Sequence, residues 1–595
     1  MKKILATIAA LALAAPGVSQ SYRDRLPEDE VMYFMLPDRF ENGETSNDRG
    51  GLKGDRLKTG YDPTSKGFFN GGDLKGLTAR LGYLQGMGIT AIWLGPIFKN
   101  KPVQGAPGNE SAGYHGYWVT DFTQVDPHLG TNADFQAFVD AAHARGMKVY
   151  MDIIVNHTAD VIAYKECPNS SCTYRSRANF PYQRRGGPSG EPINPGFAGD
   201  KVRTEENFAK LTDMTFAYSP FIPRGEERVK VPAWLNDMTL YHHRGNTTFT
   251  NESSTMGDFV GLDDVMTEHP RVVQGMIDIF GGWIDRYGID GFRVDTAKHV
   301  NPEFWQAFVP AMVARAKAKG IPNFHIFGEI GGIGLEPGKL AVHTRVDGFP
   351  SVIDFAFRQA AINTVGGAAA TEQLEELFAG DPLYEGGEAA ARIQPTFISN
   401  HDNGRFAFYV RQAFPKATDD EVMKRVILGH AMLLTLRGVP VIYSGDEQGF
   451  AGDGGDQDAR ETMFASKVAS YNDNDLIGTD ATTAQANFVT SHPIYRALSD
   501  MARLRAAEPA LRRGAQMLRA RRDKPGLFAV SRILDGREVL VAFNTSTTPL
   551  EANVEVGMLS SQFTSLRGSC APTASAPGSV RVTIAPLDYI VCAAK

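Results

Sequence analysis

The sequence predicts a (β/α)8 TIM barrel with a small domain inserted after its third strand and an all-β sandwich domain at the C-terminus. Three observations support this fold: eight short apolar runs, amphipathic helical segments between several of them, and alternating strand patterns after roughly residue 512. The chain of 595 residues is long enough for a barrel with insertions and a further domain.

The eight expected barrel strands are short and apolar, and they end beside polar or glycine residues. They lie at 31–36, 91–96, 148–154, 291–295, 325–329, 352–357, 395–400 and 440–445. Helical periodicity marks 271–288 and 421–438, and 492–514 is expected to be a closing helix. Because strands and helices alternate, the strands are expected to be parallel.

The segment between the third strand and the helix at 271–288 is too long for a loop without structure of its own. We therefore expect an inserted domain over 156–256, with the barrel formed by 21–155 and 257–511. From residue 512 to 595 the pattern changes to alternating strands separated by turn residues, which predicts the C-terminal β-sandwich.

Composition is that of a soluble globular protein, with 43% hydrophobic and 22% charged residues. The formal net charge of -7 gives no electrostatic reason to expect a nucleic-acid partner. Two Arg-rich stretches, 175–185 and 512–522, are interpreted as solvated surface.

Residues 1–20 have the pattern of a secretory signal peptide: Lys2 and Lys3, then an apolar run, then small residues. No later run is long enough to span a membrane. We expect a secreted or periplasmic protein.

Export permits disulfide bonds, and the chain has four cysteines. Three pairings are possible; the local ones, Cys167 with Cys172 and Cys570 with Cys592, best fit two separate folding units. A zinc site is the alternative, but the two pairs are far apart and neither has a C-x-x-C spacing.

Polar residues stand where the expected strands end, which is where barrel enzymes place their active sites. The third strand leads through Asp152 to His157, the fourth ends at Asp295, the fifth at Glu329 and the seventh at Asp402. A single aspartate there is usually a helix cap or a surface ion pair, but carboxylates from four strands at one mouth indicate chemistry. No phosphate-binding, dinucleotide-binding or serine-hydrolase motif is present in a fitting context, so glycoside hydrolysis is favoured.

Four ordered motifs, "MDIIVNH", "GFRVDTAKHV", "FGEI" and "FISNHD", resemble the signature regions of the α-amylase family, glycoside hydrolase family 13. The similarity also includes "VMYFMLPDRF", "SAGYHGYWVTDF" and "GVPVIYSGDEQ" and extends over roughly residues 30–465. The resemblance implies that Asp295 is the nucleophile, Glu329 the general acid/base and Asp402 the stabiliser of the distorted sugar. Arg293, on the same strand face as Asp295, is expected to keep that nucleophile ionised.

The resemblance also implies further contacts with the sugar chain. His157 and His401 would hydrogen-bond the sugar at the cleavage point, Tyr117 with His115 would stack on it, and Asp456 and Arg460 would be more distant contacts. The pair formed by Lys298 and His299 resembles that of α-1,4-glucan-acting members.

One or two Ca²⁺ ions are implied in the same way, because the matching residues are hard oxygen ligands. A first ion would be held by Asn156, Asp264 and the His299 carbonyl. A second would be held by the loop residues Asn42, Glu44, Asn47, Asp48, Asp73 and the Gly71 carbonyl. The alternative interpretation of this loop is a turn made of ordinary turn-forming residues.

Three functions remain open from the sequence. The first is a monomeric, retaining α-amylase-type hydrolase of starch, maltooligosaccharides or related α-glucans. The second is a maltogenic or cyclodextrin-acting hydrolase or a 4-α-glucanotransferase on the same fold. The third, a catalytically silent glucan-binding protein, would require the loss of a catalytic carboxylate, yet Asp295, Glu329 and Asp402 are all present.

Overall fold

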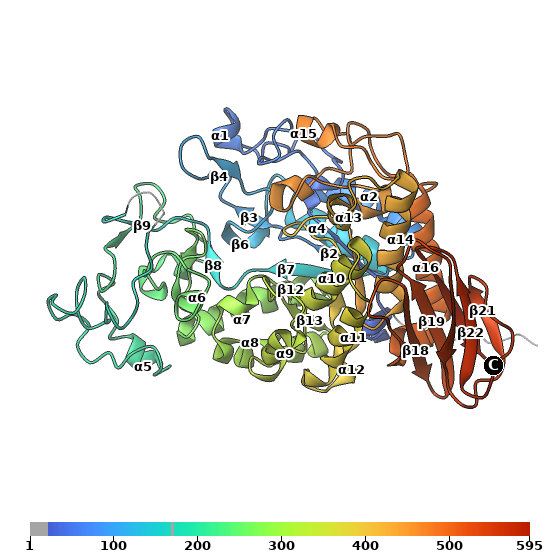
Figure 1. Cartoon of the computed structure of the whole chain (residues 1–595). Helices are drawn as coiled ribbons and strands as arrows, with labels where there is room; N and C mark the ends of the chain where they lie inside the picture. The colour runs from blue at the N-terminus through green and yellow to red at the C-terminus, as the bar shows by residue number, and fades with distance from the viewer. Residues whose placement is uncertain (1–21, 168–171) are drawn as a thin grey trace, which may run out of the picture.

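A computed structural model describes residues 22–167 and 172–595. Its centre is an eight-stranded parallel sheet in the order β14-β13-β12-β7-β2-β1-β16-β15 (Figure 1). A parallel bridge between Asp354 and Thr396 joins the two ends of this sheet, so it closes into the predicted (β/α)8 barrel. The strands are β1 (Met32–Met35), β2 (Ala91–Leu94), β7 (Lys148–Ile153), β12 (Gly291–Val294), β13 (His325–Gly328), β14 (Ser351–Val352), β15 (Pro395–Thr396) and β16 (Val439–Tyr443).

The prediction of a sixth strand over 352–357 is wrong for most of that range. β14 ends at Val352, and helix α10 begins at Phe355. The Asp354 side chain accepts the Phe357 amide N–H (2.8 Å), which fixes the helix start, so the apolar run after it forms the first helical turn. The expected seventh strand is likewise shorter, because β15 ends at Thr396.

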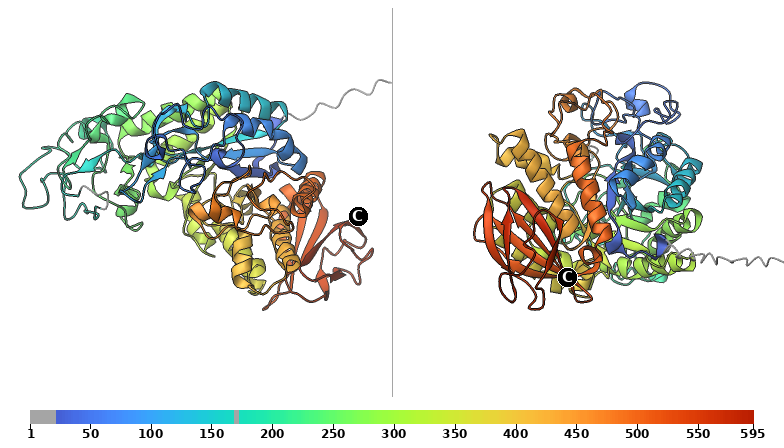
Figure 2. Two further views of the ribbon diagram at one scale, coloured as in Figure 1. Left: turned by 90° about the horizontal axis from the view of Figure 1, so that it is seen from above. Right: turned by 90° about the vertical axis from the view of Figure 1, so that its right-hand side faces the viewer.

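Helices surround the barrel, as two further views show (Figure 2). The predicted helix at 271–288 is α7 (Pro270–Tyr287), that at 421–438 is α14 (Asp419–Thr435), and the closing helix is divided into α16 (Pro493–Ala507) and α17 (Pro509–Arg513). In the described ranges, the other α-helices of five or more residues are α2 (Leu74–Ala79), α3 (Leu81–Met87), α4 (Asn132–Ala144), α8 (Pro302–Ala318), α9 (Pro337–Arg345), α10 (Phe355–Ala361), α11 (Glu372–Ala379) and α13 (Phe406–Ala413).

The segment between β7 and helix α7 protrudes from one side of the barrel (Figure 1). It contains short elements only: β8 (His157–Thr158), β9 (Ala163–Tyr164), α5 (Glu205–Phe208), β10 (Pro220–Phe221), α6 (Ser253–Met256) and β11 (Asp263–Asp264). β11 pairs with β8, so the segment returns to its starting point beside the barrel mouth. A disulfide between Cys167 and Cys172 lies within it, which confirms the first predicted pairing.

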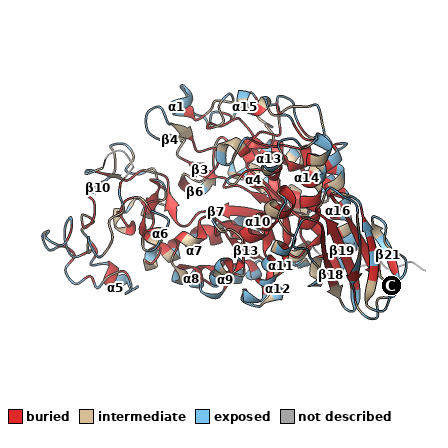
Figure 3. Cartoon of the chain, in the orientation of Figure 1, coloured by how far each residue is buried: buried red, intermediate tan, exposed pale blue. Residues whose placement is uncertain are grey.

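The C-terminal part is all-β, as predicted. A five-stranded sheet in the order β17-β18-β19-β23-β21 faces a two-stranded sheet of β20 and β22, and buried apolar residues of both sheets form one cluster. Figure 3 shows buried residues along the strands of this part of the chain. The Cys570–Cys592 disulfide confirms the second predicted pairing. The strands are β17 (Ala515–Ala520), β18 (Leu527–Leu534), β19 (Arg537–Asn544), β20 (Leu550–Glu555), β21 (Phe563–Arg567), β22 (Ser579–Ile584) and β23 (Asp588–Ala594).

The interior of the barrel is apolar and aromatic, with Phe34, Trp93 and Phe327 packed together. Into this interior β7 and β12 place two charged side chains, Asp152 and Arg293, each about 1% exposed. The expected signal peptide, 1–20, lies outside the described residues. Within the described ranges, no helix is both long enough and apolar enough to cross a membrane.

Candidate active site

The barrel strands hold the two central carboxylates at their carboxyl ends. The Asp295 amide donates to the Ile153 carbonyl (2.9 Å) and the Glu329 amide donates to the Val294 carbonyl (2.9 Å), so both residues continue the strand ladder. Thr296 then adopts a left-handed conformation (φ 47°) and its amide donates to Glu329 Oε2 (3.1 Å). A threonine in this conformation is strained, and such strain is found preferentially at functional sites.

One guanidinium binds three carboxylates. Arg293 Nη1 lies 2.6 Å from Asp152 Oδ1 and 2.9 Å from Asp295 Oδ1, while its Nη2 lies 2.9 Å from Glu329 Oε2. The planar fork of arginine suits such contacts because its donors point in fixed directions. Arg293 thereby holds the expected nucleophile and the expected acid/base side by side, and Asp152 supplies a third negative charge behind them.

Burial and charge act in opposite directions on Asp295. Burial raises the pKa of the Asp295 carboxyl well above its usual range; the Arg293 charge lowers this pKa, and Glu329, Asp152 and Asp402 raise it further. The Arg293 charge thus favours the ionised form of Asp295, as the sequence predicts. Burial has the larger effect on the pKa of Asp295. The pKa of Asp152 is raised to about 7, chiefly by burial.

Tyr117 connects this cluster to the opposite side of the mouth. Its hydroxyl lies 3.2 Å from Asp152 Oδ2 and 2.8 Å from His401 Nε2, and its ring is stacked on the His401 ring. Trp93 donates its indole N–H to Asp152 Oδ2 (3.2 Å). The Asp152 carboxylate is therefore bonded on both oxygens and fixed in place.

Arg460 organises the third carboxylate. Its Nη2 lies 3.0 Å from Asp402 Oδ1 and 2.5 Å from Asp456 Oδ1, and its Nε donates to the His401 carbonyl (3.0 Å). The Asp402 side chain remains 41% exposed, so it can still contact a ligand.

Three of the histidines predicted to contact substrate, His115, His157 and His401, are uncharged near neutral pH. Burial lowers the pKa of His157 to about 3 and lowers the pKa values of His115 and His401 well below their usual range. His157 Nε2 is buried and has no hydrogen-bond partner within the protein. A ligand hydroxyl in the adjoining cleft would satisfy it.

An open cleft of about 1210 Å³ lies over these residues. Of the predicted catalytic and substrate-binding residues, the structure brings eight to its walls: His115, Tyr117, His157, Asp295, Glu329, Asp402, Asp456 and Arg460. Arg293 and His401 lie in the layer beneath it.

Lys298 and His299 do not line the cleft. Lys298 Nζ donates to the Gly331 carbonyl (2.6 Å), and His299 Nδ1 lies 2.7 Å from the Ser254 carbonyl. These contacts tie the loop after Asp295 to the loop after Glu329 and to the protruding segment.

Sequence reasoning assigned no role to several residues that build this site. Asp152 was recognised only as a strand-end carboxylate, although an acidic residue inside the apolar run "KVYMDII" already indicates an unusual barrel interior. Trp118, Phe259 and Val260 also line the cleft. The positions of Phe259 and Val260 depend on how the protruding segment folds back, which no local pattern reveals.

The loop residues predicted to hold a second Ca²⁺ fall into two groups. Asn42 Oδ1 and Asn47 Oδ1 are buried without hydrogen-bond partners, beside the buried carboxylates Asp48 and Asp73, whose pKa values burial raises. A β-carbon at Gly71 (φ 110°) would lie 2.9 Å from Asp48 Oδ1, so glycine lets the backbone approach. These oxygens fit a hard cation. Glu44 does not belong with them, because it pairs with Lys75 and Ser46 at the surface.

The residues predicted to hold the first Ca²⁺ fit less well. Asp264 Oδ2 lies 2.6 Å from His242 Nδ1, and His242 Nε2 lies 3.0 Å from Glu268. Although burial opposes it, Glu268 and Asp264 raise the pKa of His242 to about 10, so this imidazole already carries a positive charge. Asn156, buried, donates to His157 Nδ1 (3.2 Å). Within residues 22–167 and 172–595, no group of three or more His, Cys, Asp or Glu side chains is arranged to hold a metal ion.

Fold and site together define a (β/α)8 barrel protein with an acid–base centre at the carboxyl ends of its strands. The sequence model for the alpha amylase catalytic domain matches residues 34–524. The chain therefore belongs to the α-amylase family, as its motifs predict.

Relatives and solved structures agree with this assignment. An α-amylase of Streptomyces lividans is 44% identical over 565 residues, which are 94% of this chain and 60% of that protein. The crystal structure of an Anoxybacillus α-amylase has a TM-score of 0.68 at 26% identity and covers 96% of this chain and 99% of its own. That of CldA, described as a cyclomaltodextrin glucanotransferase with three domains, has a TM-score of 0.70 at 26% identity and covers 95% and 99%.

Proposed function

We propose that this protein is a retaining glycoside hydrolase that cleaves α-1,4-glucosidic bonds in starch, maltooligosaccharides or related α-glucans. The observation that carries the proposal is the sharing of Arg293 by Asp295 and Glu329 beneath an open cleft, because retaining hydrolysis needs two neighbouring carboxyl groups. The likeness to a protein named α-amylase supports the choice of α-glucan. The chain spans 60% of the length of that relative, so the activity is inferred mainly from the site.

The reaction would proceed in two steps. Asp295 attacks the anomeric carbon to form a glycosyl ester while Glu329 gives its proton to the departing glycosidic oxygen. Glu329 then removes a proton from water, which attacks the same carbon and releases Asp295. Asp402, held by Arg460 at 3.0 Å, would bind the hydroxyls of the distorted sugar.

Arg293 would tune both steps. Its contact to Asp295 favours the charged form of that carboxyl, whereas burial and the Asp152 charge raise the pKa of Asp295 and favour its proton. Consequently a small rearrangement of hydrogen bonds on substrate binding can determine which carboxyl group is ionised. His157 is uncharged, and because its Nδ1 accepts from Asn156, its unpartnered Nε2 carries the proton and is suited to donate a hydrogen bond to a sugar hydroxyl.

A second candidate, transfer of glucosyl chains in place of hydrolysis, is favoured by the likeness to CldA. In that reaction a sugar hydroxyl replaces water in the second step, so the same residues act. The outcome depends on whether the cleft wall formed by Phe259 and Val260 retains an acceptor sugar.

Calcium is proposed as a structural ion in the loop cluster of Asn42, Asn47, Asp48 and Asp73. Bound there, it would compensate the negative charge and satisfy the two orphaned amide oxygens. For the Asn156–Asp264 position, the His242 charge competes with a cation, so the loop cluster is the stronger candidate.

Export to the periplasm or medium is also proposed, supported by the leader pattern of residues 1–20 and by two disulfide bonds. The domain limits that accompany the function, 156–256 for the insertion and 512–595 for the β-sandwich, remain proposals, as does a monomeric state.

A product time course tests the function. The full chain is incubated with soluble starch, maltoheptaose, β-cyclodextrin and pullulan, and the Asp295→Asn variant is the control. Mixed maltooligosaccharides with a steady gain of reducing ends, absent from the variant, would support hydrolysis. Larger or cyclic products with little gain in reducing ends would indicate transfer in place of hydrolysis. If the wild-type protein and the Asp295→Asn variant are equally inert on every glucan, hydrolysis and transfer are both refuted.

A further inference from the structure

The three proposed catalytic carboxylates are held in place by different means. Asp295 and Glu329 directly follow β12 and β13, and their backbone amides continue the ladder of the barrel strands. Asp402 lies in a turn beyond the end of β15 at Thr396, and its side chain is 41% exposed. The barrel ladder therefore does not fix the Asp402 carboxylate, and other contacts have to position it.

A second segment, 454–461, packs against the turn that carries Asp402. The Asp456 amide donates to the Asp402 carbonyl (2.9 Å). A β-carbon at Gly455 would lie 2.4 Å from the Asp402 carbonyl oxygen, and one at Gly404 (φ 88°) would lie 2.5 Å from the Gly454 carbonyl oxygen. Glycines thus allow the two backbones to make direct contact, so a movement of either backbone displaces the other.

The side chain of Arg460 makes a direct bond to the Asp402 carboxylate, with Nη2 3.0 Å from Oδ1. This bond keeps the carboxylate in one orientation only if the 454–461 segment is itself fixed. Glu461, the next residue, is 4% exposed and accepts a hydrogen bond from Arg405 Nε (2.7 Å). Arg405 therefore holds the backbone of Arg460 through its neighbour.

Arg405 also connects both segments to the rigid barrel. Its side chain is fully buried, and its Nη1 donates to the Ser444 carbonyl (2.9 Å) and to Asp446 Oδ1 (3.0 Å). Ser444 directly follows β16, and its amide donates to the Phe34 carbonyl of β1 (2.9 Å), so it continues the strand ladder. Because Arg405 closely follows Asp402, one guanidinium joins the Asp402 turn, the 454–461 segment and the end of a barrel strand.

Many buried ion pairs hold a fold together without affecting a reaction. Burial raises the pKa of Glu461 and the Arg405 charge lowers it, as in other compensated pairs. Arg405 differs because its acceptors, on Ser444, Asp446 and Glu461, all follow β16 at the same end of the barrel as the cleft. The fixed fork of a guanidinium suits several acceptors at once, whereas a lysine ammonium acts as a point charge.

We propose that Arg405 is a positioning residue for Asp402. Through Glu461 and Ser444 it fixes Arg460, and Arg460 in turn orients the Asp402 carboxylate toward the hydroxyls of the distorted sugar. The proposal rests on the proposed function, because this orientation matters only if the cleft binds such a sugar. A displaced Asp402 stabilises the transition state less and leaves most contacts with the unreacted glucan intact, so the loss should affect kcat more than KM.

Arg405→Lys in the full-length protein tests this role, because it keeps the positive charge and removes the fixed fork. On maltoheptaose we expect kcat to fall by about tenfold to a hundredfold and KM to change by less than about threefold. Glu461→Gln, which keeps the size of the acceptor side chain, should lower kcat by about threefold or more. This second variant keeps the proposal testable if Arg405→Lys does not fold.

A double variant separates positioning from a merely structural role. Arg405→Lys, Asp402→Asn and their combination are assayed with α-maltotriosyl fluoride, a reactive donor that keeps slow rates measurable. If Arg405 acts through Asp402, adding Arg405→Lys to Asp402→Asn should lower the rate by less than about twofold. A merely structural role would lower the rate by the same factor in both backgrounds.

Arg437→Lys is the matched control, because Arg437 lies at the other end of β16. Arg437 is 1% exposed and also pairs with two carboxylates, those of Asp354 (2.5 Å) and Asp381 (2.6 Å). We expect a lower Tm, as for Arg405→Lys, but a kcat within about twofold of the wild-type value.

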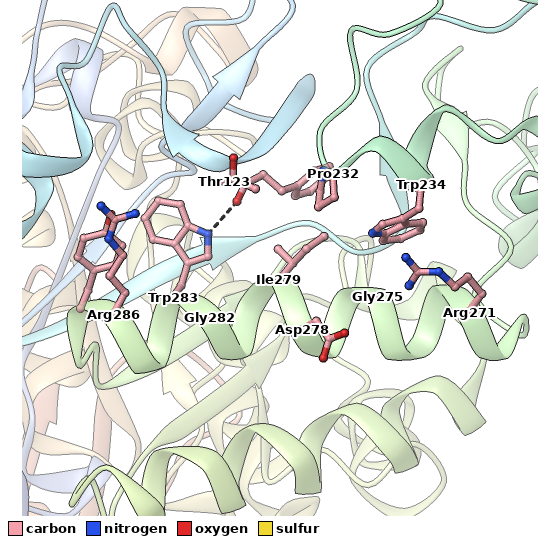
Figure 4. Close-up of a pocket in the computed structure, with 12 residues that line it drawn as sticks. Thr123, Pro232, Trp234, Arg271, Gly275, Asp278, Ile279, Gly282, Trp283 and Arg286 are labelled. Carbon is pink, nitrogen blue, oxygen red and sulfur yellow. Dashed lines mark hydrogen bonds between the residues drawn. The ribbon is translucent and has the colours of Figure 1, made fainter.

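Arg271→Lys is a second control, at an exposed arginine. Arg271 lies over the Trp234 ring on the outer side of α7, with 4.7 Å between the guanidinium carbon and the ring centre (Figure 4). Neither Tm nor kcat should change appreciably, because surface substitutions have small effects.

Three results would each overturn the positioning role and leave the proposed function intact. They are an unchanged kcat in Arg405→Lys or in Glu461→Gln, equal kcat losses in Arg405→Lys and Arg437→Lys, and a full additional loss in the Asp402→Asn background. If the wild-type protein hydrolyses neither maltoheptaose nor the fluoride, the proposed function itself fails, and the positioning role fails with it.

Discussion

The barrel mouth and the loop cluster of Asn42, Asn47, Asp48 and Asp73 both bury carboxylates, but only the mouth supplies its own cation. Arg293 binds three carboxylates at 2.6–2.9 Å in the mouth. In the loop cluster, within the described part of the chain, no ion pair joins Asp48 or Asp73 to a basic side chain.

This difference distinguishes a site suited to acid/base catalysis from a site suited to a structural ion. A charge that is internally compensated can change its protonation without the fold failing, which an acid/base centre needs. A group of oxygens without an internal cation is stable only when one is supplied, which suits a structural ion. The predictions below test this division, beginning with the largest expected effect.

Glu329→Gln keeps the size of the side chain but removes its exchangeable proton. We expect kcat on maltoheptaose to fall by roughly 10²- to 10⁴-fold, the usual contribution of a general acid/base, while the thermal midpoint changes little. Asp73→Asn should do the opposite, lowering the midpoint and leaving kcat within about twofold at saturating calcium. If Asp73→Asn reduced kcat as much as Glu329→Gln, the division between the two regions would be wrong.

Arg293→Met removes the cation of the mouth and leaves three buried carboxylates without a positively charged partner. Breaking a buried ion pair costs about 3–5 kcal/mol, and urea denaturation should show a loss of this size that grows as the pH rises and more carboxyls ionise. Arg503→Met, at a side chain 69% exposed and paired only with Asp500, should cost less than about 0.5 kcal/mol. Equal losses in the two variants would contradict the role given to Arg293.

Calcium should affect the loop cluster and not the mouth. Free Ca²⁺ at a hundredfold excess over its Kd stabilises a protein by about 2.7 kcal/mol, so chelation should lower Tm by several degrees. In the double variant Asn47→Ala/Asp73→Asn, Tm should no longer depend on calcium. A calcium-dependent Tm that persists in this variant but disappears in Asp264→Asn would assign the ion to the other position.

The sequence predicted the mouth better than its surroundings because the chemical residues lie at fixed offsets from barrel strands. Asp295 and Glu329 directly follow β12 and β13 and could be placed from strand ends alone, whereas Asp402 lies beyond the end of β15 at Thr396 and was placed by its motif. The sharing of Arg293 among three carboxylates could not be predicted, since it depends on β7 and β12 being neighbours in register. The prediction of the sixth strand failed because the capping side chain of Asp354 starts helix α10 within an apolar run.

The smallest expected effect concerns Asp152, whose negative charge raises the pKa of Asp295. Asp152→Asn removes that charge and leaves Arg293 to the two remaining carboxylates, so the pKa of Asp295 should fall. The nucleophile is then ionised at lower pH, and the acid limb of the kcat/KM profile should move down by about one pH unit. The position of the limb is the informative quantity, because a merely structural role for Asp152 would lower activity at all pH values without moving it. A limb that stays in place or moves upward would show that Asp152 does not act on Asp295 through its charge.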